Sequence, residues 1–552
     1  MAEDRRLDSV QITVDGQALP ADQHQLLQLV RVEESVQLPD AFTLRFDDPH
    51  FELFDRGAFR LGSRVEIAFR AEGEEPVIVT TGEVTAIAVE PGPGGRHELV
   101  LTGLDAAHRL ARGPKSRSFL QMTDTDIVAQ IGSEHGLDTD VEATSEVHDY
   151  VLQANETDYA FASRLARRIG FDFWVSGDTL HFRERPSANG AAPTLRWGDN
   201  LQTFKMRYAS SERCDEVTVR GWDPVGKRTV LGRASEGDRG STAPAAEELA
   251  VDARAAFGAI SRCAGQFPVA SEAEADELAH ALLAKASGGE VLARGVSVGD
   301  PLIAAGSEVT VERMGQRLSG TYRLTSVEHV YRAGSPYRTR FECGAKEPSS
   351  LIDLARSGIG HAEDRKGWGS LVVGVVTNCD DPERLGRVKV KFPSLTDDDE
   401  STWARVVAPG GGPERGLQCL PEVGDEVLVG FELDDKHRPL VLGGLWNRDD
   451  ALPDADTVVD GEVTARVWHS RNAHHLELRD EPEGTIVLAL GDGDSELRLT
   501  SPESSLHGER KLEITAQEIE VRADRSLTLK APQIAIEGDS EVKVSGGVIR
   551  LN

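Results

Sequence analysis

The sequence has few aromatic residues and no long hydrophobic run. Aromatics make up 5% of its 552 residues, against 54 glycines and 25 prolines. That balance favours many short strands and tight turns over long packed helices. No run is long enough to cross a bilayer, and the opening residues, MAEDRRLDSVQITVDGQ, contain no apolar stretch of the kind that a secretory signal carries. We therefore expect a mostly β protein of several domains, made in the cytoplasm without a leader peptide.

Basic residues and cysteines are also scarce. Lys and Arg number 61 against 93 Asp and Glu, so the formal net charge is −32. Neutralising a phosphate backbone requires clustered cations, and this excess of acid therefore argues against a nucleic-acid partner. The five cysteines lack the close pairs of a zinc site and the density of a disulfide scaffold. We expect no cofactor, and buried reduced thiols at Cys214, Cys263, Cys343, Cys379 and Cys419.

A small α+β domain is predicted over residues 113–190. TDTDIVAQIGSEHG has a capping Thr123 or Asp124, apolar residues on one helical face, and Gly136 where a helix would stop. ETDYAFASRLARRIG ends at Gly170 in the same way. The following FDFWVSGDTLHFRER alternates on both sides of a turn and predicts a hairpin.

Two related β-barrel domains flank this one, over residues 1–112 and 191–350. In both, a Gly-Ser pair opens an alternating strand, a second glycine opens another, and a turn leads to a third strand that ends on glycine. A single repetition of this kind indicates a duplicated domain rather than a solenoid. The matching positions are Gly62, Gly82 and Gly103 in the first copy and Gly306, Gly320 and Gly344 in the second.

The second barrel carries an insertion. ASEGDRGSTAPAAEE, residues 234–248, lacks aliphatic periodicity and is expected to be a loop. SEAEADELAHALLAKASGG follows as a capped helix. After a linker at 351–368, residues 369–448 hold five short strands, the inventory of an OB-fold barrel. Oligonucleotide binding does not follow from that fold alone, because the basic strand RVKVKF has no aromatic ladder beside it.

The last domain, residues 449–552, ends in paired apolar residues spaced alternately by seven and eight positions. Each pair predicts a short strand with one apolar face and no second sheet to cover it. One chain alone would form only two turns of a β-helix, whereas three chains could close a triangular prism without open edges. We expect a homotrimer with a core of Leu512, Ile514, Ile519, Val521, Leu527, Leu529, Ile534, Ile536, Val542, Val544, Ile549 and Leu551.

Several motifs together resemble VgrG and the hub and spike proteins of contractile phage tails and extracellular contractile injection systems. They are DPERLGRVKVKFP, WARVVAP, LPEVGDEVLVGFELDDKHRPLVLGGLWN, ANETDYAFASRLARRIGF and GDPLIAAGSEVTV. The resemblance covers nearly the whole chain in the order of hub domains, OB-fold and triple-stranded β-helix spike. The two barrels would then be hub barrels, and the α+β domain a hub domain.

The resemblance implies a homotrimer at the centre of a baseplate, with six hub barrels facing a hexameric inner tube. It also implies a PAAR-type tip protein on the end of the spike, docked on Val548, Ile549, Arg550, Leu551 and Asn552, and effector cargo as a further partner. No lysozyme-like domain lies between the OB-fold and the spike, and no catalytic domain follows VIRLN, so any toxin would be a separate cargo. The particle would be extracellular after release or ejected into its target, touching the target membrane only transiently.

The enzyme interpretation depends on WHSRNAHHLELRDE, where His469, His474, His475 and Glu477 cluster. Zinc hydrolases hold His pairs at helical spacing beside a carboxylate, and this segment has neither that order nor that period. The acidic run TDDDE, Thr396 to Glu400, lacks the ligand spacing of a calcium loop. The glycine runs at Gly92 and Gly410 lack a following Lys-Ser/Thr and helix, so they are not phosphate loops.

We therefore predict a structural protein with no catalytic, cofactor or metal site. It is expected to link the inner tube to the piercing tip and to puncture the target envelope. The alternative is a secreted β-rich, metal-dependent hydrolase effector that uses the His474 and His475 cluster.

Overall fold

The computed structural model divides the chain into two units, Met1–Leu445 and Trp446–Asn552, which are described separately. It describes residues 10–71, 75–184, 192–208, 210, 213–223, 226–235, 244–265, 267, 269, 271–288, 290–344, 371–394, 399–480, 484–491 and 493–550. The linker predicted at 351–368 lies outside these ranges. No helix within them is long and apolar enough to cross a membrane.

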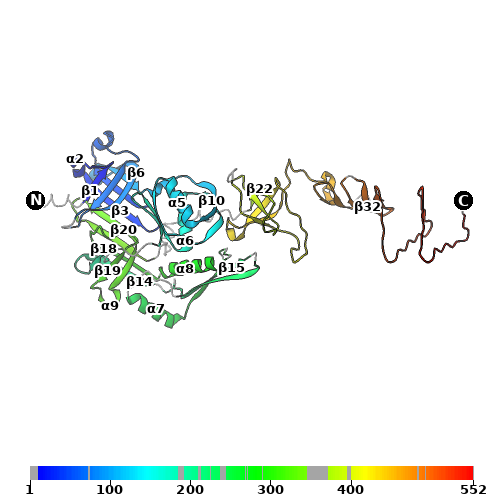
Figure 1. Ribbon diagram of the computed structural model, residues 1–552. Helices are drawn as coiled ribbons and strands as arrows, with labels where there is room; N and C mark the ends of the chain where they lie inside the picture. The colour runs from blue at the N-terminus through cyan, green and yellow to red at the C-terminus, as the bar shows by residue number, and fades with distance from the viewer. Residues whose placement is uncertain are drawn as a thin grey trace. The chain divides into compact units, whose positions relative to one another are not determined.

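A sheet of 13 strands organises the first part of unit 1 (Figure 1). Its main path runs β14-β18-β21-β20-β3-β4-β7-β6-β5-β1-β2, with β13 and β19 paired beside β20. The first copy of the duplication supplies β1 (Val10–Val14), β2 (Gln17–Ala18), β3 (Leu27–Ser35), β4 (Ala41–Asp47), β5 (Arg64–Phe69), β6 (Val77–Pro91) and β7 (His97–Leu104). The second supplies β13 (Thr194–Arg196), β14 (Leu201–Tyr208), β18 (Val291–Val298), β19 (Glu308–Glu312), β20 (Gly320–Arg332) and β21 (Arg338–Cys343). Short helices accompany them: α2 (Ala21–Gln25), α3 (Glu52–Asp55), α4 (Ala107–Leu110) and α9 (Gly315–Leu318).

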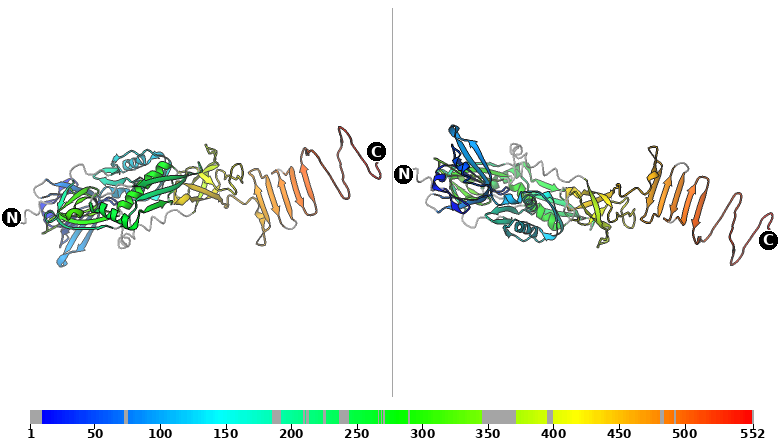
Figure 2. Two further views of the ribbon diagram at one scale, coloured as in Figure 1. Left: turned by 90° about the horizontal axis from the view of Figure 1, so that it is seen from below. Right: turned by 90° about the horizontal axis from the view of Figure 1, so that it is seen from above.

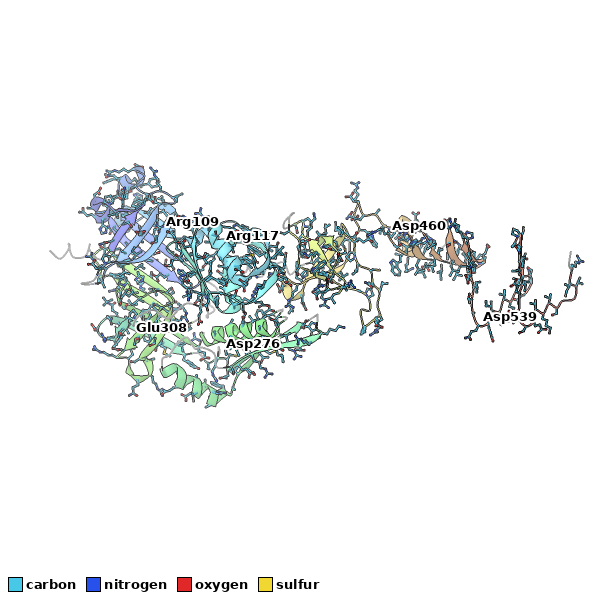
Figure 3. All side chains as sticks on the ribbon, in the orientation of Figure 1. Arg109, Arg117, Asp276, Glu308, Asp460 and Asp539 are labelled. Carbon is cyan, nitrogen blue, oxygen red and sulfur yellow. The ribbon has the colours of Figure 1, made fainter. Side chains whose placement is uncertain are left out.

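The predicted α+β domain is confirmed by β8 (Lys115–Thr123), α5 (Asp124–Glu134), β9 (Asp138–Val141), β10 (Val147–Glu156), α6 (Asp158–Ile169), β11 (Asp172–Ser176) and β12 (Thr179–Arg183). Thr123 caps α5 in a capping box with Asp126, as the local sequence predicts. Gly170 ends α6 in the left-handed conformation, with φ of 81°. Arg117, labelled in Figure 3, pairs with Glu134 at 2.6 Å and with the buried Asp158 at 2.9 Å, and so ties strand β8 to both helices.

The insertion in the second barrel is larger than the single helix expected. It consists of β15 (Glu216–Asp223), β16 (Arg228–Ser235), α7 (Pro244–Phe257), β17 (Ser261–Ala264) and α8 (Glu272–Gly288). These strands form their own three-stranded sheet over a separate core. The loop prediction for 234–248 is wrong at Ala234 and Ser235, which end β16, and from Pro244 onward, where α7 begins. The alanine-rich sequence of α7 has high helix propensity without aliphatic periodicity. Residues 236–243 lie outside the described ranges.

The predicted OB-fold is confirmed as a closed barrel of β22 (Val372–Asn378), β23 (Arg387–Lys391), β24 (Ala404–Val406), β26 (Pro439–Gly444) and β25 (Glu426–Phe431). Its β22–β23 connection is organised by Asp381. This carboxylate accepts hydrogen bonds from the backbone amides of Glu383 and Leu385 and from the Arg387 guanidinium, the last at 2.7 Å. These donors hold the pKa of Asp381 well below its usual range.

Unit 2 begins with the small pair β27 (Val458–Val459) and β28 (Glu462–Val463). An antiparallel sheet follows, made of β29 (Ala465–His469), β30 (His475–Arg479), β31 (Thr485–Ala489), β32 (Ser495–Thr500) and β33 (Ser504–Gly508). This first half of the predicted 449–552 spike therefore pairs its strands within one chain instead of intertwining them. Beyond it, residues 511–550 carry no assigned strand, and Figure 2 shows them as a bare trace.

The five cysteines are all free. Cys214 and Cys343 are buried as expected and Cys379 is half-buried. The expectation of buried thiols is wrong for Cys263 and Cys419, which are exposed. Spacing along the chain reports whether cysteines can pair, but it carries little information on burial.

Candidate assembly surfaces

The duplication in unit 1 extends to individual hydrogen bonds. Gly62 and Gly306 both have positive φ, 83° and 82°, and their amides donate to the carbonyls of Val84 and Leu324 at 2.8 Å. A bulge follows each of these acceptors at the same place. In both bulges a threonine hydroxyl donates across to the neighbouring strand at 3.2 Å. The two copies are therefore equivalent in backbone geometry as well as in sequence pattern.

The register between the copies differs by one residue from that expected at the third strand. Val84 lies opposite Gly103, whereas Leu324 lies opposite Cys343. Gly103 therefore corresponds to Cys343 and not to Gly344. Gly82 lies opposite Val65 and Tyr322 lies opposite Val309, so the predicted match of Gly82 with Gly320 is also wrong, by two residues. The shared terminal glycine misled the sequence comparison, because the bulge position and the pairing partner are long-range properties.

Strand β3 of the first copy and β20 of the second join the two copies into one sheet. Seven residue pairs connect them, from Leu29 opposite Arg332 to Ser35 opposite Ser326. Across this seam, Tyr331 and Tyr337 of the second copy are buried in the hydrophobic core of the first. The Tyr337 ring stacks on Phe69 with centroids 4.4 Å apart. The second copy thus completes the core of the first.

A buried histidine lies in this seam. His329 is fully buried, and burial lowers its pKa to about 4. Its Nε2 lies 3.0 Å from the carbonyl oxygen of Ile303, which can only accept, so Nε2 carries the proton. Nδ1 then accepts from the Tyr337 hydroxyl at 2.6 Å. A neutral His329 satisfies both contacts, and its protonation would leave a charge in the seam.

One face of the β29–β33 sheet is apolar and exposed. Strand registers align Trp468, Leu476, Leu488, Leu497 and Leu506 in one row across all five strands. A second row on the same face contains Leu478, Ile486 and Leu499. Leu488 is 57% exposed and Trp468 is 53% exposed. An apolar face of this extent indicates an interaction surface.

The tail beyond residue 511 exposes its paired apolar residues in the same way. Leu527 and Leu529 are 59% and 64% exposed, and the other described members of the predicted core are between 49% and 67% exposed. Leu551 lies outside the described residues. Side chains in this segment, including the labelled Asp539, project from an extended backbone against which no other described part of unit 2 packs (Figure 3). An exposed apolar pattern of this length indicates an interaction surface.

The sequence-predicted tip site lies at the end of this segment. Val548 is 78% exposed and Ile549 is 53% exposed, while Asn552 falls outside the described residues. The exposed valine and the neighbouring Arg550 offer an apolar and a basic contact.

The histidines of the enzyme alternative do not converge. His469 and His475 lie opposite each other with ring centroids 5.0 Å apart, but His474 accepts from the Gly491 amide at 2.9 Å, and Glu477 pairs with Arg479 at 2.6 Å. Within the described ranges, no group of three or more His, Cys, Asp or Glu residues has the arrangement of a metal site.

The acidic run at Thr396–Glu400 is partly outside the described residues, which resume at Asp399. The Asp399 carboxylate accepts from the amide and hydroxyl of Ser118, at 3.2 and 2.8 Å. Glu400 pairs with Lys389 at 2.6 Å. These two acids therefore join the OB barrel to the α+β domain and to its own basic strand. The glycine runs at Gly92 and Gly410 lie in turns between strands.

A duplicated sheet, an OB barrel and a C-terminal segment with an uncovered apolar face follow one another along the chain, which is the domain order of the VgrG-like proteins that the sequence resembles. A family model described as the Alg8 N-terminal domain matches residues 4–332, more than half of the sequence, and the chain belongs to that family. A second model, the type VI secretion system/phage-baseplate injector OB domain, matches residues 372–446 and coincides with the closed barrel.

Curated relatives are type VI secretion system spike proteins. VgrG5 of Pseudomonas aeruginosa is 24% identical over 428 residues, which cover 67% of this chain and 50% of the relative. VgrG3 of Vibrio cholerae is 27% identical over 135 residues, 23% of this chain and 13% of the relative. The chain thus spans at most about half the length of these relatives. Among solved structures, the half-lidded Francisella PdpA-VgrG complex gives a TM-score of 0.53 at 8% identity, over 90% of this chain and 88% of that one, and this likeness shows the fold.

Proposed function

We propose that three copies of this chain form the hub and spike of a contractile injection system. Unit 1 would seat on the hexameric inner tube, and unit 2 would lead to the piercing tip and puncture the target envelope. The role is mechanical rather than catalytic. The observation that carries the proposal is the uncovered apolar surface of unit 2, which consists of the β29–β33 face and the paired residues of the tail.

Three copies fit this surface because each chain offers one apolar face. Three such faces close a triangular prism whose interior is apolar and whose exterior keeps the polar residues. The duplication in unit 1 supports the same number. Two equivalent copies per chain give six similar elements in a trimer, as a sixfold tube requires.

The partners follow from the same arrangement. Inner tube and baseplate proteins would contact unit 1, and effector cargo would be carried by separate chains. A PAAR-type tip protein would dock on Val548, Ile549 and Arg550, with Leu551 and Asn552 completing its seat. The particle would act outside the producing cell after release, or be ejected into the target.

The mass of the full-length protein tests the proposal. Light scattering or native mass spectrometry should give three times the 59.8 kDa of one chain. A monomer at micromolar concentration would refute the prism and the six-element hub together.

A further inference from the structure

In its described part, the sheet of unit 1 has two long open strand edges, on β14 and on the second half of β6, besides the short edge strands β2 and β13. Strand β14 is the end of the sheet and pairs only with β18. Strand β6 pairs with β5 only as far as Glu83, so its residues from Thr85 to Pro91 have β7 on one side and no described strand on the other. Open edges of this length are templates for pairing with another chain.

The duplication shows what each open edge corresponds to. Strand β14 is the counterpart of β3, since Thr203 opposite Val296 matches Leu29 opposite Arg45, and both strands have a bulge just before this position. Strand β6 is the counterpart of β20, as the shared bulges and threonine bonds establish. The β3–β20 seam within the chain therefore pairs the same two kinds of edge that β14 and β6 leave open.

We infer that β14 of one copy adds to β6 of a second copy of this chain, in the register of the β3–β20 seam. Transferring that register places Met206 opposite Val89, Lys205 opposite Glu90 and Arg207 opposite Ala88. The number of copies in the resulting ring rests on the trimer proposed above. The register rests on the duplication alone.

The chemistry of the two edges is complementary. On the outer face, Lys205 meets the carboxylate of Glu90, and opposite charges on directly paired residues stabilise antiparallel strands. The β3–β20 seam also has a cross-strand ion pair, between Arg31 and Glu328 at 2.9 Å. On the inner face, Val89 is 37% exposed in the single chain, and pairing with β14 would cover it.

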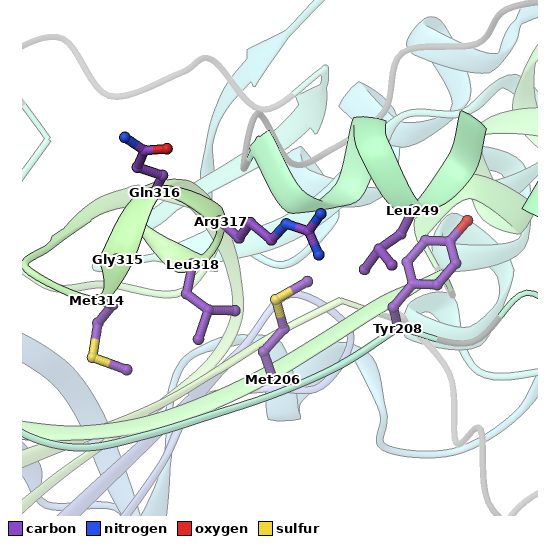
Figure 4. A pocket seen from close by; sticks show the side chains of 8 residues that line it. All are labelled: Met206, Tyr208, Leu249, Met314, Gly315, Gln316, Arg317 and Leu318. Carbon is purple, nitrogen blue, oxygen red and sulfur yellow. The ribbon is translucent and has the colours of Figure 1, made fainter. Parts of the chain in front are cut away.

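A cavity lies beside β14 where the inner-face residues would enter (Figure 4). It has a volume of about 590 Å³, and Met206, Tyr208, Met314 and Leu318 are among its lining residues. Figure 4 shows the Met206 and Leu318 side chains turned toward this space, between β14 and α9. In the first copy, the corresponding place beside β3 is occupied.

The occupants beside β3 are the side chains of His329, in β20, and of Tyr337, which directly precedes β21. His329 lies opposite Val32, the counterpart of Met206, and Tyr337 stacks on Phe69. The counterparts of His329 and Tyr337 in the first copy are Val89 and His97. The hairpin of β6 and β7 from a second copy is therefore the occupant that the cavity fits, as the hairpin of β20 and β21 fits the first core.

Disulfide trapping tests the register in the full-length protein. Directly opposite residues on antiparallel strands lie within disulfide reach. In a background with both exposed cysteines removed, Cys263→Ser and Cys419→Ser, the pair Lys205→Cys with Glu90→Cys should give covalent dimers and trimers under mild oxidation. The matched control is Lys205→Cys with Ile78→Cys, since Ile78 is 59% exposed on the same strand but twelve residues away.

The outcomes separate this inference from the proposed function. Covalent oligomers with Glu90→Cys and not with Ile78→Cys support the register. A protein of trimeric native mass that yields no disulfide, or yields as much with the control, overturns the register and leaves the trimer standing. A monomeric native mass instead overturns the proposed function and the ring with it.

Discussion

Replacing Leu527 and Leu529 by Asp should abolish trimerisation of the tail. These side chains are 59% and 64% exposed in the single chain, so covering them is worth roughly 1.5 kcal/mol each. The substitution loses about 3 kcal/mol of burial per chain and places two carboxylates in a dry core. At roughly 3 to 5 kcal/mol for each unpaired buried charge, the total cost is on the order of 10 kcal/mol per chain. A tenfold change in an association constant corresponds to about 1.4 kcal/mol, so no association of the tail should survive at micromolar concentration.

The assay combines native mass with hydrogen exchange of peptides from 512–550. In the wild type, amides of the tail should be protected by strands of the other two chains, whereas in the variant they should exchange at the rate of an unfolded peptide. The matched control is Thr528→Asp, which adds one carboxylate between the two leucines but on the outer row, and should keep both the mass and the protection. A Leu527→Asp/Leu529→Asp protein that remains a trimer with protected tail amides would refute the prism.

Three further predictions concern the sheet of unit 2, the seam of unit 1 and the OB barrel. Leu488→Asp, in the middle of the exposed apolar row, should weaken the trimer by several kcal/mol in a dilution series read by native mass, whereas Ser505→Asp on the opposite face should leave it unchanged. His329 has a lowered pKa of about 4, so the unfolded state takes up the proton first as pH falls. The neutral His329 should therefore contribute about 3 kcal/mol to the free energy of unfolding above pH 6.5, and this contribution should be lost as the pH falls to 4. Chemical denaturation at a series of pH values should show that the free energy of unfolding of His329→Gln falls less over this range. Asp381→Asn removes the charge that holds the β22–β23 connection and should lower the stability of this connection by about 3 kcal/mol. Peptides covering 371–394 should then exchange hydrogen faster. An unchanged exchange rate would contradict the role given to Asp381.

Features set by local sequence were predictable. The caps at Thr123 and Gly170 use side-chain and backbone contacts within a few residues, so the helix limits of the α+β domain follow from the chain itself. The five barrel strands of the OB-fold follow from alternation and turn residues. The spacing of the paired apolar residues in the tail is visible in the sequence alone, and their role as a trimer core stays a prediction.

Features set by long-range pairing were not predictable. Nothing in the alternation of β3 or β20 says that they pair with each other, and the one-residue error at Gly344 arose because a bulge is defined by its partner strand. The sequence predicted a single helix where the second copy has an inserted sheet and two helices. This sheet was missed because β15 and β17, far apart in sequence, pair only in the folded chain. The self-paired sheet in the first half of the spike has the same apolar alternation as an intertwined one, so sequence alone cannot separate the two.

Because the edges at β14 and β6 are open, the number of chains that join through them has to be limited. They differ from each other, so each added chain presents a fresh edge for the next, and such head-to-tail addition produces filaments unless the rotation closes. A spike segment that associates in threes would limit this addition to three chains. Expressed without its spike, unit 1 would keep both open edges: closed trimers would then show that the strand pairing fixes the rotation between copies, and fibres would show that the spike does.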